Sequence, residues 1–451
     1  QIELFKHISQ QRLIIEELAT HQLSLLKTKK ARKKRTTNQF AIKNNLSNNL
    51  LNSLEFNLTA AQSRCIKEIH ADLSNTEPML RLLQGDVGSG KTIVAIFALI
   101  QAVENNFQTA VMAPTEILAR QHLQNFTDYL KPLNIQIAYL SGSQNTQERI
   151  EQLELIETGK AKVIIGTHAL FQENVNFENL SLVIIDEQHK FGVHQRLSLT
   201  QKAKKTPHQL VMTATPIPRS LTMSAYADLD TSVIDELPPG RQPVETVALS
   251  NSRRDELIGK IRKISDEGRQ IYWVCTLIEE SEALRAESAE KTFNYLSSNL
   301  EDLKVVMIHG RLTKPEKEAI MSDFAQGNIN LLVATTVIEV GVNVPNASLM
   351  IVENSERLGL AQLHQLRGRV GRGSEKSICI LMYQSPLSDN AKQRLEVLRQ
   401  SNDGFMIAQK DLELRGPGEI LGTQQTGIAS MKIANIVRDA YLLKEASYYS
   451  S

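Results

Sequence analysis

Gly85-Asp86-Val87-Gly88-Ser89-Gly90-Lys91-Thr92 is the stretch that decides the fold. It follows the apolar run Met79 to Leu83 and leads into the apolar segment Ile93 to Ile100, which predicts a strand, a phosphate-binding loop and a helix. Glycines let the backbone curl so that successive N–H groups point at phosphate oxygens, and the helix N-terminus adds the positive end of its dipole. Kinases, GTPases, transporters and motors share such a loop, so the rest of the chain must decide the class.

Side chains in and before this loop are the predicted nucleotide contacts. We expect Lys91 to reach the β and γ phosphates of ATP and the Thr92 hydroxyl to bind Mg²⁺. Upstream, the Gln62 amide offers donors and an acceptor to adenine, and Thr59 is a suitable N-cap for its helix. ATP and Mg²⁺ are therefore the predicted cofactors. The predicted nucleotide-binding residues are Gln62, Gly85, Asp86, Val87, Gly88, Ser89, Gly90, Lys91 and Thr92.

Length and composition indicate a multidomain globular protein. A chain of 451 residues exceeds what one hydrophobic core organises, and its 41% apolar and 22% charged residues are ordinary for such proteins. No apolar run approaches the roughly 20 residues that span a bilayer, and no signal pattern opens the chain, so we expect a cytoplasmic protein without membrane contact. Cys65, Cys275 and Cys379 lack metal or disulfide spacing and are interpreted as buried apolar residues. Gln1 in place of Met suggests a fragment of a longer protein.

The first 50 residues combine a helical pattern with a basic run. From Ile2 to Leu26 the apolar residues recur at helical spacing, which predicts one or two amphipathic helices. The run from Lys27 to Arg35 is strongly basic and is followed by an Asn-rich stretch. It has two interpretations, a contact to the DNA backbone or a solvated linker, and both remain open.

Beyond the loop, apolar runs predict a parallel sheet covered on both faces, because they are continuous rather than alternating. Ligands bind beyond the carboxyl ends of such strands. Polar residues do follow the runs, as in Pro114-Thr115 and Gly166-Thr167. The runs are Thr109 to Ala113, Ile135 to Leu140, Val163 to Ile165, Leu182 to Ile185 and Leu210 to Met212.

Asp186 and Glu187 stand where one of these strands ends, which identifies them as the predicted hydrolytic pair. Asp186 is placed to hold Mg²⁺ through water, and Glu187 to orient or deprotonate the attacking water. A lone carboxylate pair on a surface helix would lack the four apolar residues that lead into this one. Residues that can couple the nucleotide to the rest of the domain are Gln188, His189, Thr213 and Thr215.

A second α/β domain follows the turn Pro238 to Arg241. It has no phosphate loop of its own, so we expect it to complete the site of the first domain. Its predicted parallel strands are Val244 to Leu249, Ile271 to Val274, Val305 to Ile308, Leu331 to Ala334, Leu349 to Val352 and Ile378 to Met382.

The second domain carries three arginines in six residues, Arg367, Arg369 and Arg372, interleaved with glycines. Guanidinium groups bind phosphate in a bidentate way, and glycines permit close approach. An arginine from a separate domain accelerates phosphoryl transfer by about 10³ to 10⁵ and makes hydrolysis depend on domain closure, as in a motor. The alternative, a basic surface patch, leaves the glycine spacing unexplained.

Taken together, these motifs resemble a superfamily 2 helicase core and, within it, the RecG family of bacterial DNA helicases. The stretches that carry the resemblance are Val183 to Arg196, Met212 to Arg219 and Glu356 to Gln365, and it extends over nearly all residues from Phe56 to Gly427. Asn402 to Phe405, Asp411 to Glu419 and Gly422 to Gly427 resemble the translocation motif that this family shares with transcription-repair coupling factor. From the residues alone we predict only a charged helix that ends at Gly-Pro-Gly turn chemistry.

The resemblance implies an α/β fold of two RecA-like parallel-sheet helicase domains, with an N-terminal helical segment and a C-terminal helical hairpin and translocation motif. The expected boundaries are 1–50 for the helical connector and basic linker, 51–235 for the ATP-binding domain, 236–392 for the C-terminal helicase domain and 393–451 for the translocation motif and C-terminal segment.

The resemblance also implies residue roles. The catalytic set is Lys91, Asp186, Glu187, Arg369 and Arg372, with Thr92 and Asp186 at the metal. The expected contacts to the DNA backbone are Pro114, Thr115, Thr167, His309, Gly310 and Thr335, and Arg415 and Gln424 join the coupling residues. Two departures stand out: Asn343 occupies a position where the family usually has Asp, and nothing before Phe56 is long enough for the family's wedge domain.

The expected function is that of an ATP-driven double-stranded DNA translocase, acting as a monomer, that remodels stalled forks and Holliday junctions. Without the wedge we expect poor unwinding of junctions. One alternative is a related duplex translocase of the transcription-repair coupling type. Another is a non-motor scaffold for branched DNA with a vestigial ATPase. A metabolite kinase would not need a second domain ending in arginines.

Overall fold

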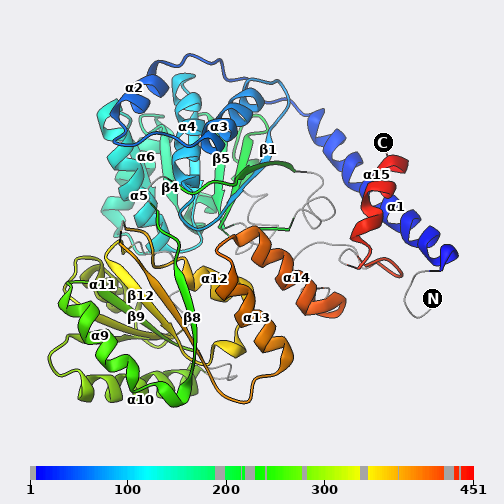
Figure 1. Cartoon of the computed structure of the whole chain (residues 1–451). Helices are drawn as coiled ribbons and strands as arrows, with labels where there is room; N and C mark the ends of the chain where they lie inside the picture. Colours follow the sequence, from blue (N-terminus) through cyan, green and yellow to red (C-terminus); the bar gives the residue numbers. More distant parts are fainter. Residues whose placement is uncertain are drawn as a thin grey trace. The chain divides into compact units, whose positions relative to one another are not determined.

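The computed structural model describes residues 7–187, 199–214, 216–218, 229–238, 241–276, 282–335, 344–373, 375–420, 431–435 and 438–450. The chain forms two compact units (Figure 1). The first unit comprises Gln1–Gly85, Ser89–Glu236 and Arg415–Ser451, and the second comprises Asp86–Gly88 and Leu237–Leu414.

The first unit contains a parallel sheet with the strand order β3-β4-β2-β5-β6-β1-β7 among its described residues. The central strands are continuous apolar runs because both faces of the sheet are buried. Along β5, Leu182 and Ile184 pack into one apolar cluster while Val183 and Ile185 pack into another on the opposite face. The strands are β1 Leu80–Gly85, β2 Gln108–Met112, β3 Ile137–Leu140, β4 Val163–Gly166, β5 Leu180–Asp186, β6 His208–Thr213 and β7 Asp230–Ile234.

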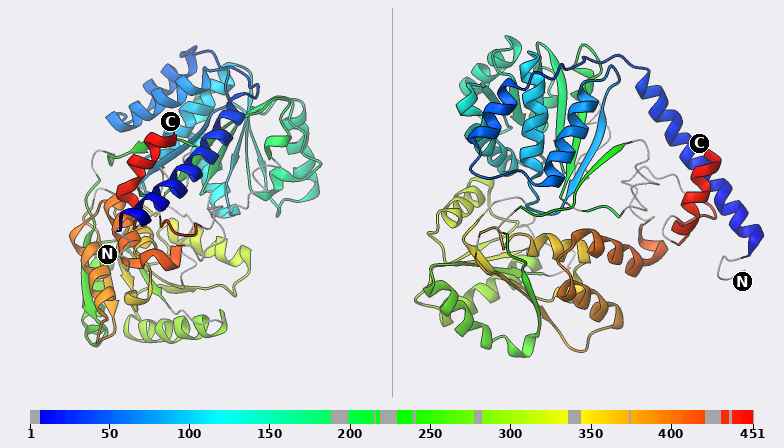
Figure 2. Two further views of the ribbon diagram at one scale, coloured as in Figure 1. Left: turned by 90° about the vertical axis from the view of Figure 1, so that its right-hand side faces the viewer. Right: turned by 45° about the horizontal axis from the view of Figure 1, so that its top comes forward.

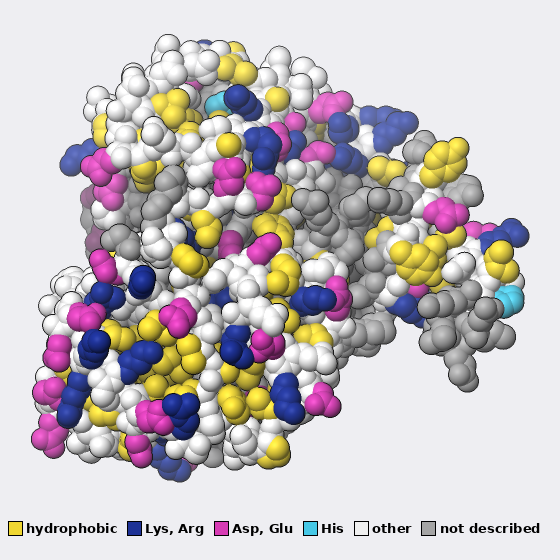
Figure 3. Space-filling view, in the orientation of Figure 1, with side chains coloured by type: hydrophobic (Ala, Val, Ile, Leu, Met, Phe, Trp, Pro, Cys, Tyr) yellow, Lys and Arg dark blue, Asp and Glu magenta, His cyan; other side chains and the backbone are white. Residues whose placement is uncertain are grey.

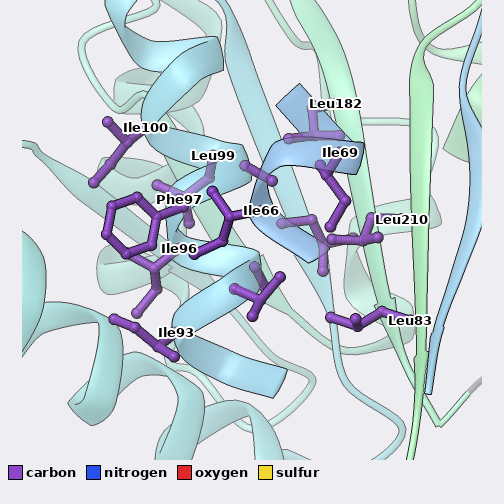
Figure 4. Packing of buried hydrophobic residues seen from close by; sticks show 14 of the residues in the cluster. Ile66, Ile69, Leu83, Ile93, Ile96, Phe97, Leu99, Ile100, Leu182 and Leu210 are labelled. Atoms are coloured by element: carbon purple, nitrogen blue, oxygen red, sulfur yellow. The ribbon is translucent and has the colours of Figure 1, made fainter. Parts of the chain in front are cut away.

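Helices cover both faces of this sheet. The core of one face is built around α4 (Lys91–Glu104), whose residues from Ile93 to Ala102 are all buried. Figure 4 shows Ile96, Phe97 and Leu99 of this helix among side chains of α3 and the strands. The other helices with described bounds in this region are α2 Asn45–Ser53, α3 Ala60–Leu73, α5 Glu116–Leu130 and α6 Thr146–Glu157.

The second unit repeats the architecture with a parallel sheet ordered β10-β11-β9-β12-β13-β8 in its described part. Tyr272 and Val274 of β9 face one apolar cluster, and Ile271 and Trp273 face the other. The strands are β8 Glu245–Ser250, β9 Gln270–Cys275, β10 Val305–Ile308, β11 Leu331–Thr335, β12 Ala347–Val352 and β13 Ile378–Tyr383. The helices are α9 Glu256–Asp266, α10 Glu282–Asn299, α11 Lys314–Ala325, α12 Leu360–Arg367, α13 Asp389–Gln400 and α14 Gly404–Ile420, the last of which runs into the first unit.

The N-terminal helix α1 (Ile8–Lys33) packs against the C-terminal helix α15 (Leu443–Ser450), and Figure 2 shows the two lying side by side. Ile14 and Leu18 of α1 form a small apolar cluster with Leu442, Leu443 and Ala446 of the C-terminal segment. Two segments from opposite ends of the chain are thereby joined by their own small core.

The basic run from Lys27 onward continues α1 as far as Lys33, so these residues are helical, and the interpretation as a linker stays a prediction. Lys29 pairs with Asp230 and Lys33 with Glu77, each at 2.7 Å, which ties the end of the helix to β7 and to the segment before β1. The remaining Lys and Arg side chains of this run are mostly exposed, and Figure 3 shows basic side chains gathered there. Contact with DNA stays a prediction.

Both predicted sheets are confirmed, and two features differ from the predictions. The edge strand β7 was not predicted, because Asp-Thr-Ser interrupts its apolar character. Helix α14 continues through Gly416-Pro417-Gly418, where turn chemistry predicted its end, so that prediction is wrong. The three cysteines are buried, as predicted. In the described part of the chain no helix is both long and apolar enough to cross a membrane.

Candidate nucleotide-binding and hydrolysis site

The phosphate loop joins β1, which ends at Gly85, to α4, which begins at Lys91. Gly88 and Gly90 have φ values of 75° and 84°, in the left-handed region that side chains with a Cβ rarely adopt. A Cβ at Gly90 would also lie 2.3 Å from Nε2 of Gln62. The glycines therefore allow both the curl of the loop and its close approach to α3.

The donors of this loop fit a polyphosphate. Lys91 Nζ lies over the loop and donates to the Gly85 carbonyl at 2.8 Å. Ser89 is fully buried, and its hydroxyl has no hydrogen-bond partner among the described residues. The first N–H groups of α4 add the positive end of the helix dipole. An ammonium, an unused buried hydroxyl and a helix N-terminus together suit an anion, and the nearby Thr92 hydroxyl suits its magnesium ion.

Gln62 is built into the start of α3. Its Oε1 accepts from the Thr59 N–H at 2.9 Å, while Thr59 Oγ1 accepts from the Gln62 N–H at 3.1 Å, so the two residues form a capping box. The Gln62 Nε2 donates to the Ser89 carbonyl at 2.9 Å. The predicted N-cap Thr59 is confirmed, and Gln62 is held against the phosphate loop by its own amide.

Asp186 is the last residue of β5, and its carboxylate contacts a residue that the sequence did not indicate. His122 Nε2 lies 2.8 Å from Asp186 Oδ2. Burial raises the pKa of Asp186, but the hydrogen bond and charge of His122, the Lys91 ammonium and the Glu187 N–H outweigh it and leave the pKa lowered. The carboxylate is therefore ionised at neutral pH and fits a divalent cation.

Glu187 follows in an unusual backbone conformation. Its φ is 52°, which is uncommon for a residue other than glycine, and its N–H donates to the Met212 carbonyl at 3.0 Å. Thr213, one of the predicted coupling residues, is the last residue of β6, the strand next to β5, and is buried. Gln188, His189, Thr215 and Gln424, like Asn343, lie outside the described residues, as does the side chain of Arg415.

The predicted DNA contacts of the first unit lie at neighbouring strand ends. Pro114 and Thr115 follow β2, and Thr167 follows β4, the strand paired with it. Thr115 Oγ1 caps α5 by accepting from the Leu118 N–H at 3.4 Å. Thr167 is 1% exposed, and its hydroxyl has no partner among the described residues. The structure brings these three residues together at one edge of the sheet.

The second unit repeats this arrangement. His309 and Gly310 follow β10, and Thr335 ends β11, which pairs with β10. The Gly310 carbonyl accepts a 2.7 Å hydrogen bond from Lys317 Nζ, and the Thr335 hydroxyl is buried without a partner among the described residues. The predicted contacts of this unit are therefore also neighbours.

The three arginines of the second unit have different environments. Arg367, the last residue of α12, is 3% exposed and donates to the carbonyls of Leu398 and Ser401. Arg369 and Arg372 lie beyond the end of the helix. Burial, together with the charges of Arg369 and Arg241, lowers the pKa of Arg372 to about 9. Crowded guanidinium groups repel one another, and an anion relieves that repulsion.

His122 and Arg367 are the structural contacts that sequence reasoning missed. His122 is separated from Asp186 by 64 residues, and no local pattern marks it. Arg367 belongs to the arginine-rich stretch that the sequence predicted to bind phosphate, yet its side chain donates hydrogen bonds to backbone carbonyls.

Family comparisons agree with this architecture. Residues 59–224 match the DEAD/DEAH box helicase family, residues 254–374 the helicase conserved C-terminal domain, and residues 401–449 the C-terminal part of domain 3 of the ATP-dependent DNA helicase RecG. The three matches follow one another along the chain, and the first two cover most strands of the two sheets, leaving out β7, β8 and β13.

Individual relatives give the same result. The chain is 56% identical over 448 residues to the ATP-dependent DNA helicase RecG of Escherichia coli K12 and 52% identical over 453 residues to that of Haemophilus influenzae, covering 98% and 100% of this chain. It spans 65% of the length of these relatives.

Solved structures show the same fold. A structure of RecG bound to a three-way DNA junction has a TM-score of 0.80 and 42% identity, over 98% of this chain and 58% of that one. Mss116p bound to single-stranded RNA has a TM-score of 0.60 at 16% identity, over 82% of this chain and 80% of that one. At that identity the second likeness shows the fold alone.

Proposed function

Because the chain belongs to the RecG family of superfamily 2 helicases, we propose that it is an ATP-dependent translocase on double-stranded DNA that remodels branched DNA such as stalled forks and Holliday junctions. The observation that carries the proposal is that the candidate phosphate-binding and hydrolytic residues lie at one edge of the sheet of the first unit. There the phosphate loop, Asp186 and Glu187 follow the carboxyl ends of β1 and β5, where α/β sheets bind ligands. The solved relative binds a three-way junction, which supports branched DNA as the substrate.

The residues of the first unit have distinct roles in this proposal. Lys91 and the N–H groups of the loop bind the phosphates, and Gln62 selects adenine. Thr92 and Asp186 hold Mg²⁺, which supplies the positive charge that phosphoryl transfer requires. Glu187 orients the attacking water and takes its proton.

The second unit supplies Arg369 and Arg372 to the γ-phosphate when the motor closes. The crowding of positive charge at Arg372 supports this role, since an anion between the guanidinium groups lowers their repulsion. Arg367 serves instead to hold α12 to the segment that follows it.

The residues at the strand ends contact the DNA backbone, which gives affinity for DNA without sequence preference. They are Pro114, Thr115, Thr167, His309, Gly310 and Thr335. Residues 51–235 and 236–392 are then the two motor domains, with residues 393–451 converting their motion into translocation. The segment 1–50, which contains α1, leads into the first motor domain. A DNA substrate and the E. coli relative support a cytoplasmic location, and the protein acts as a monomer.

The decisive experiment measures the ATPase rate with no DNA, with single-stranded DNA, with linear duplex and with a four-way junction. We expect the largest stimulation by the junction or the duplex. Lys91→Ala should abolish hydrolysis and translocation while DNA binding persists. Equal rates under all four conditions, or DNA remodelling that survives Lys91→Ala, would contradict the proposal and favour a scaffold.

A further inference from the structure

Helix α5 joins two places that the proposed function uses. Its N-cap is Thr115, one of the proposed DNA contacts, and about two helical turns further along it carries His122, which contacts Asp186. A packed helix moves as a rigid element. A displacement at its first turn therefore reaches the imidazole of His122.

Few contacts orient the His122 ring. The side chain is 9% exposed, and Nε2 lies 2.8 Å from Asp186 Oδ2. Because an ionised carboxylate only accepts hydrogen bonds, Nε2 carries the proton. The Phe126 ring, one turn later, packs edge-on against the imidazole, with ring centroids 5.8 Å apart and an interplanar angle of 87°.

The second ring nitrogen of His122 argues against a purely structural role. Nδ1 is buried and has no hydrogen-bond partner among the described residues. Burial of a polar atom without a partner disfavours folding. An apolar side chain of similar size would fill the same space beside Phe126 without that penalty, so the contact with Asp186 is what distinguishes histidine here.

We propose that His122 is a positioning residue that fixes the Asp186 carboxylate for Mg²⁺-bound nucleotide and transmits displacement of α5 to it. The imidazole engages only one carboxylate oxygen, Oδ2. A histidine that is hydrogen-bonded to a metal-binding carboxylate, without binding the metal itself, orients that carboxylate. Loss of such a partner typically lowers metal affinity by about 10- to 100-fold. The transmission from DNA, unlike the positioning, rests on the proposed function.

Two amide substitutions separate positioning from mere packing. A Gln amide nitrogen falls near the place of Nε2 of histidine, whereas an Asn amide nitrogen falls near the place of Nδ1. His122→Gln therefore keeps a donor within reach of Asp186, and His122→Asn keeps the same chemistry out of reach. The measurement is the affinity for a fluorescent ADP analogue with Mg²⁺ and with EDTA, whose ratio gives the gain due to the metal.

The metal gain is this ratio of nucleotide affinity with Mg²⁺ to affinity with EDTA. We expect His122→Gln to keep it within about 3-fold of the value for the unmodified protein, and His122→Asn to lower it by about 10-fold or more. His70→Asn is the matched control, because His70 lies on α3 of the same unit and its imidazole is hydrogen-bonded to the Phe97 carbonyl rather than to a carboxylate. It should leave the gain unchanged. Should His122→Asn fail to fold, His122→Phe keeps the ring beside Phe126 and removes the donor.

The second readout is the ratio of ATPase rates with and without duplex DNA, which should fall in His122→Asn more than in His122→Gln. Equal metal gains in the Gln and Asn variants would overturn the positioning role. An unchanged stimulation ratio in the Asn variant would overturn the transmission. If the unmodified protein shows no stimulation by DNA, the proposed function and with it the transmission fail, while the nucleotide measurements still judge the positioning of Asp186.

Discussion

The guanidinium group of Arg367 donates a hydrogen bond to the carbonyl oxygen of Leu398, with Nη1 2.8 Å from the acceptor. The same nitrogen donates to the Ser401 carbonyl at 2.8 Å, and Nη2 lies 2.9 Å from His364 Nδ1. At the other end of α12, the Leu360 N–H donates to Asp411 of α14 at 3.3 Å. Helix α12 is therefore fastened at one end to the C-terminal end of α13 and at the other to α14, where the proposed translocation motif lies.

Arg367→Lys should uncouple hydrolysis from movement. A lysine ammonium lacks the planar fork of donors that reaches several carbonyls at once, so the C-terminal end of α13 loses its cap. We expect the free energy of unfolding of the second unit to fall by about 2 kcal/mol. We also expect DNA translocation per ATP hydrolysed to fall more than the ATPase rate itself. Urea denaturation and a translocation assay measure the two effects.

Arg399→Lys is the control for this change, because Arg399 pairs with Glu396 on the exposed face of α13. Exposed pairs of this kind contribute about 0–1 kcal/mol. Equal effects of the two lysine substitutions would contradict the proposed role of Arg367.

Glu17 should make the attachment of the C-terminal segment depend on pH. Its carboxylate accepts from the N–H groups of Lys432, Ile433 and Ala434 at 2.6, 2.9 and 2.8 Å. Burial raises the pKa of Glu17, but these three hydrogen bonds outweigh it and leave the pKa below its ordinary value of 4.5. A lowered folded pKa contributes stability that is present above the unfolded pKa and is lost as the pH falls through the folded value.

The attachment should therefore persist from about pH 7 to about pH 5 and weaken at lower pH. Hydrogen exchange at Ala434 and in α15 measures it. Glu17→Gln should exchange faster already at neutral pH and lose the pH dependence, because an amide oxygen binds three N–H groups more weakly than a carboxylate. Glu16→Gln is the neighbouring control, since the Glu16 carboxylate is exposed and pairs with the exposed Arg12. Slow exchange in Glu17→Gln at every pH would count against this account.

Gln62→Ala should weaken nucleotide binding and its selectivity. The substitution removes the hydrogen bond to the Ser89 carbonyl and half of the capping box at Thr59. We expect KM for ATP to rise about 10-fold, which corresponds to about 1.4 kcal/mol, and the preference for ATP over GTP to narrow. Steady-state kinetics with both nucleotides test this.

Thr59→Ala separates the two losses, because it removes the helix cap but leaves the Gln62 amide. It should lower stability by about 1 kcal/mol with little effect on the ATP preference. If Thr59→Ala narrows the preference as much as Gln62→Ala does, the amide does not read the base.

Arg372→Gln should abolish most hydrolysis without destabilising the second unit. Burial, and after it repulsion by Arg369 and Arg241, lowers the pKa of Arg372 to about 9, so the substitution removes a charge that the folded protein disfavours. We therefore expect the free energy of unfolding to stay constant or rise. The ATPase rate should fall by about 10³ to 10⁵. Arg253→Gln, at an exposed arginine paired with Glu256, should leave the ATPase rate intact. A full ATPase rate in Arg372→Gln would remove this residue from the proposed catalytic set.

Sequence alone determined the features that depend on neighbouring residues. The phosphate loop can be predicted because its glycines, lysine and threonine lie within a few consecutive residues. The strands can be predicted because burial on both faces of the sheet requires continuous apolar runs. The edge strand β7 was missed for the same reason, since an edge strand tolerates Asp-Thr-Ser. The ion pairs of the basic run could not be predicted, because Asp230 and Glu77 are distant from it in the chain.

Tertiary structure alone decided which side chains meet across such distances. Asp186 was found from its strand, but its partner His122 lies on a helix that reaches β5 only when the sheet is assembled. The sequence does not distinguish Arg367 from Arg369 and Arg372. In the structure the side chain of Arg367 is buried and donates hydrogen bonds to backbone carbonyls. Hydrogen bonds act over about 3 Å, and folding rather than sequence separation sets which atoms come that close.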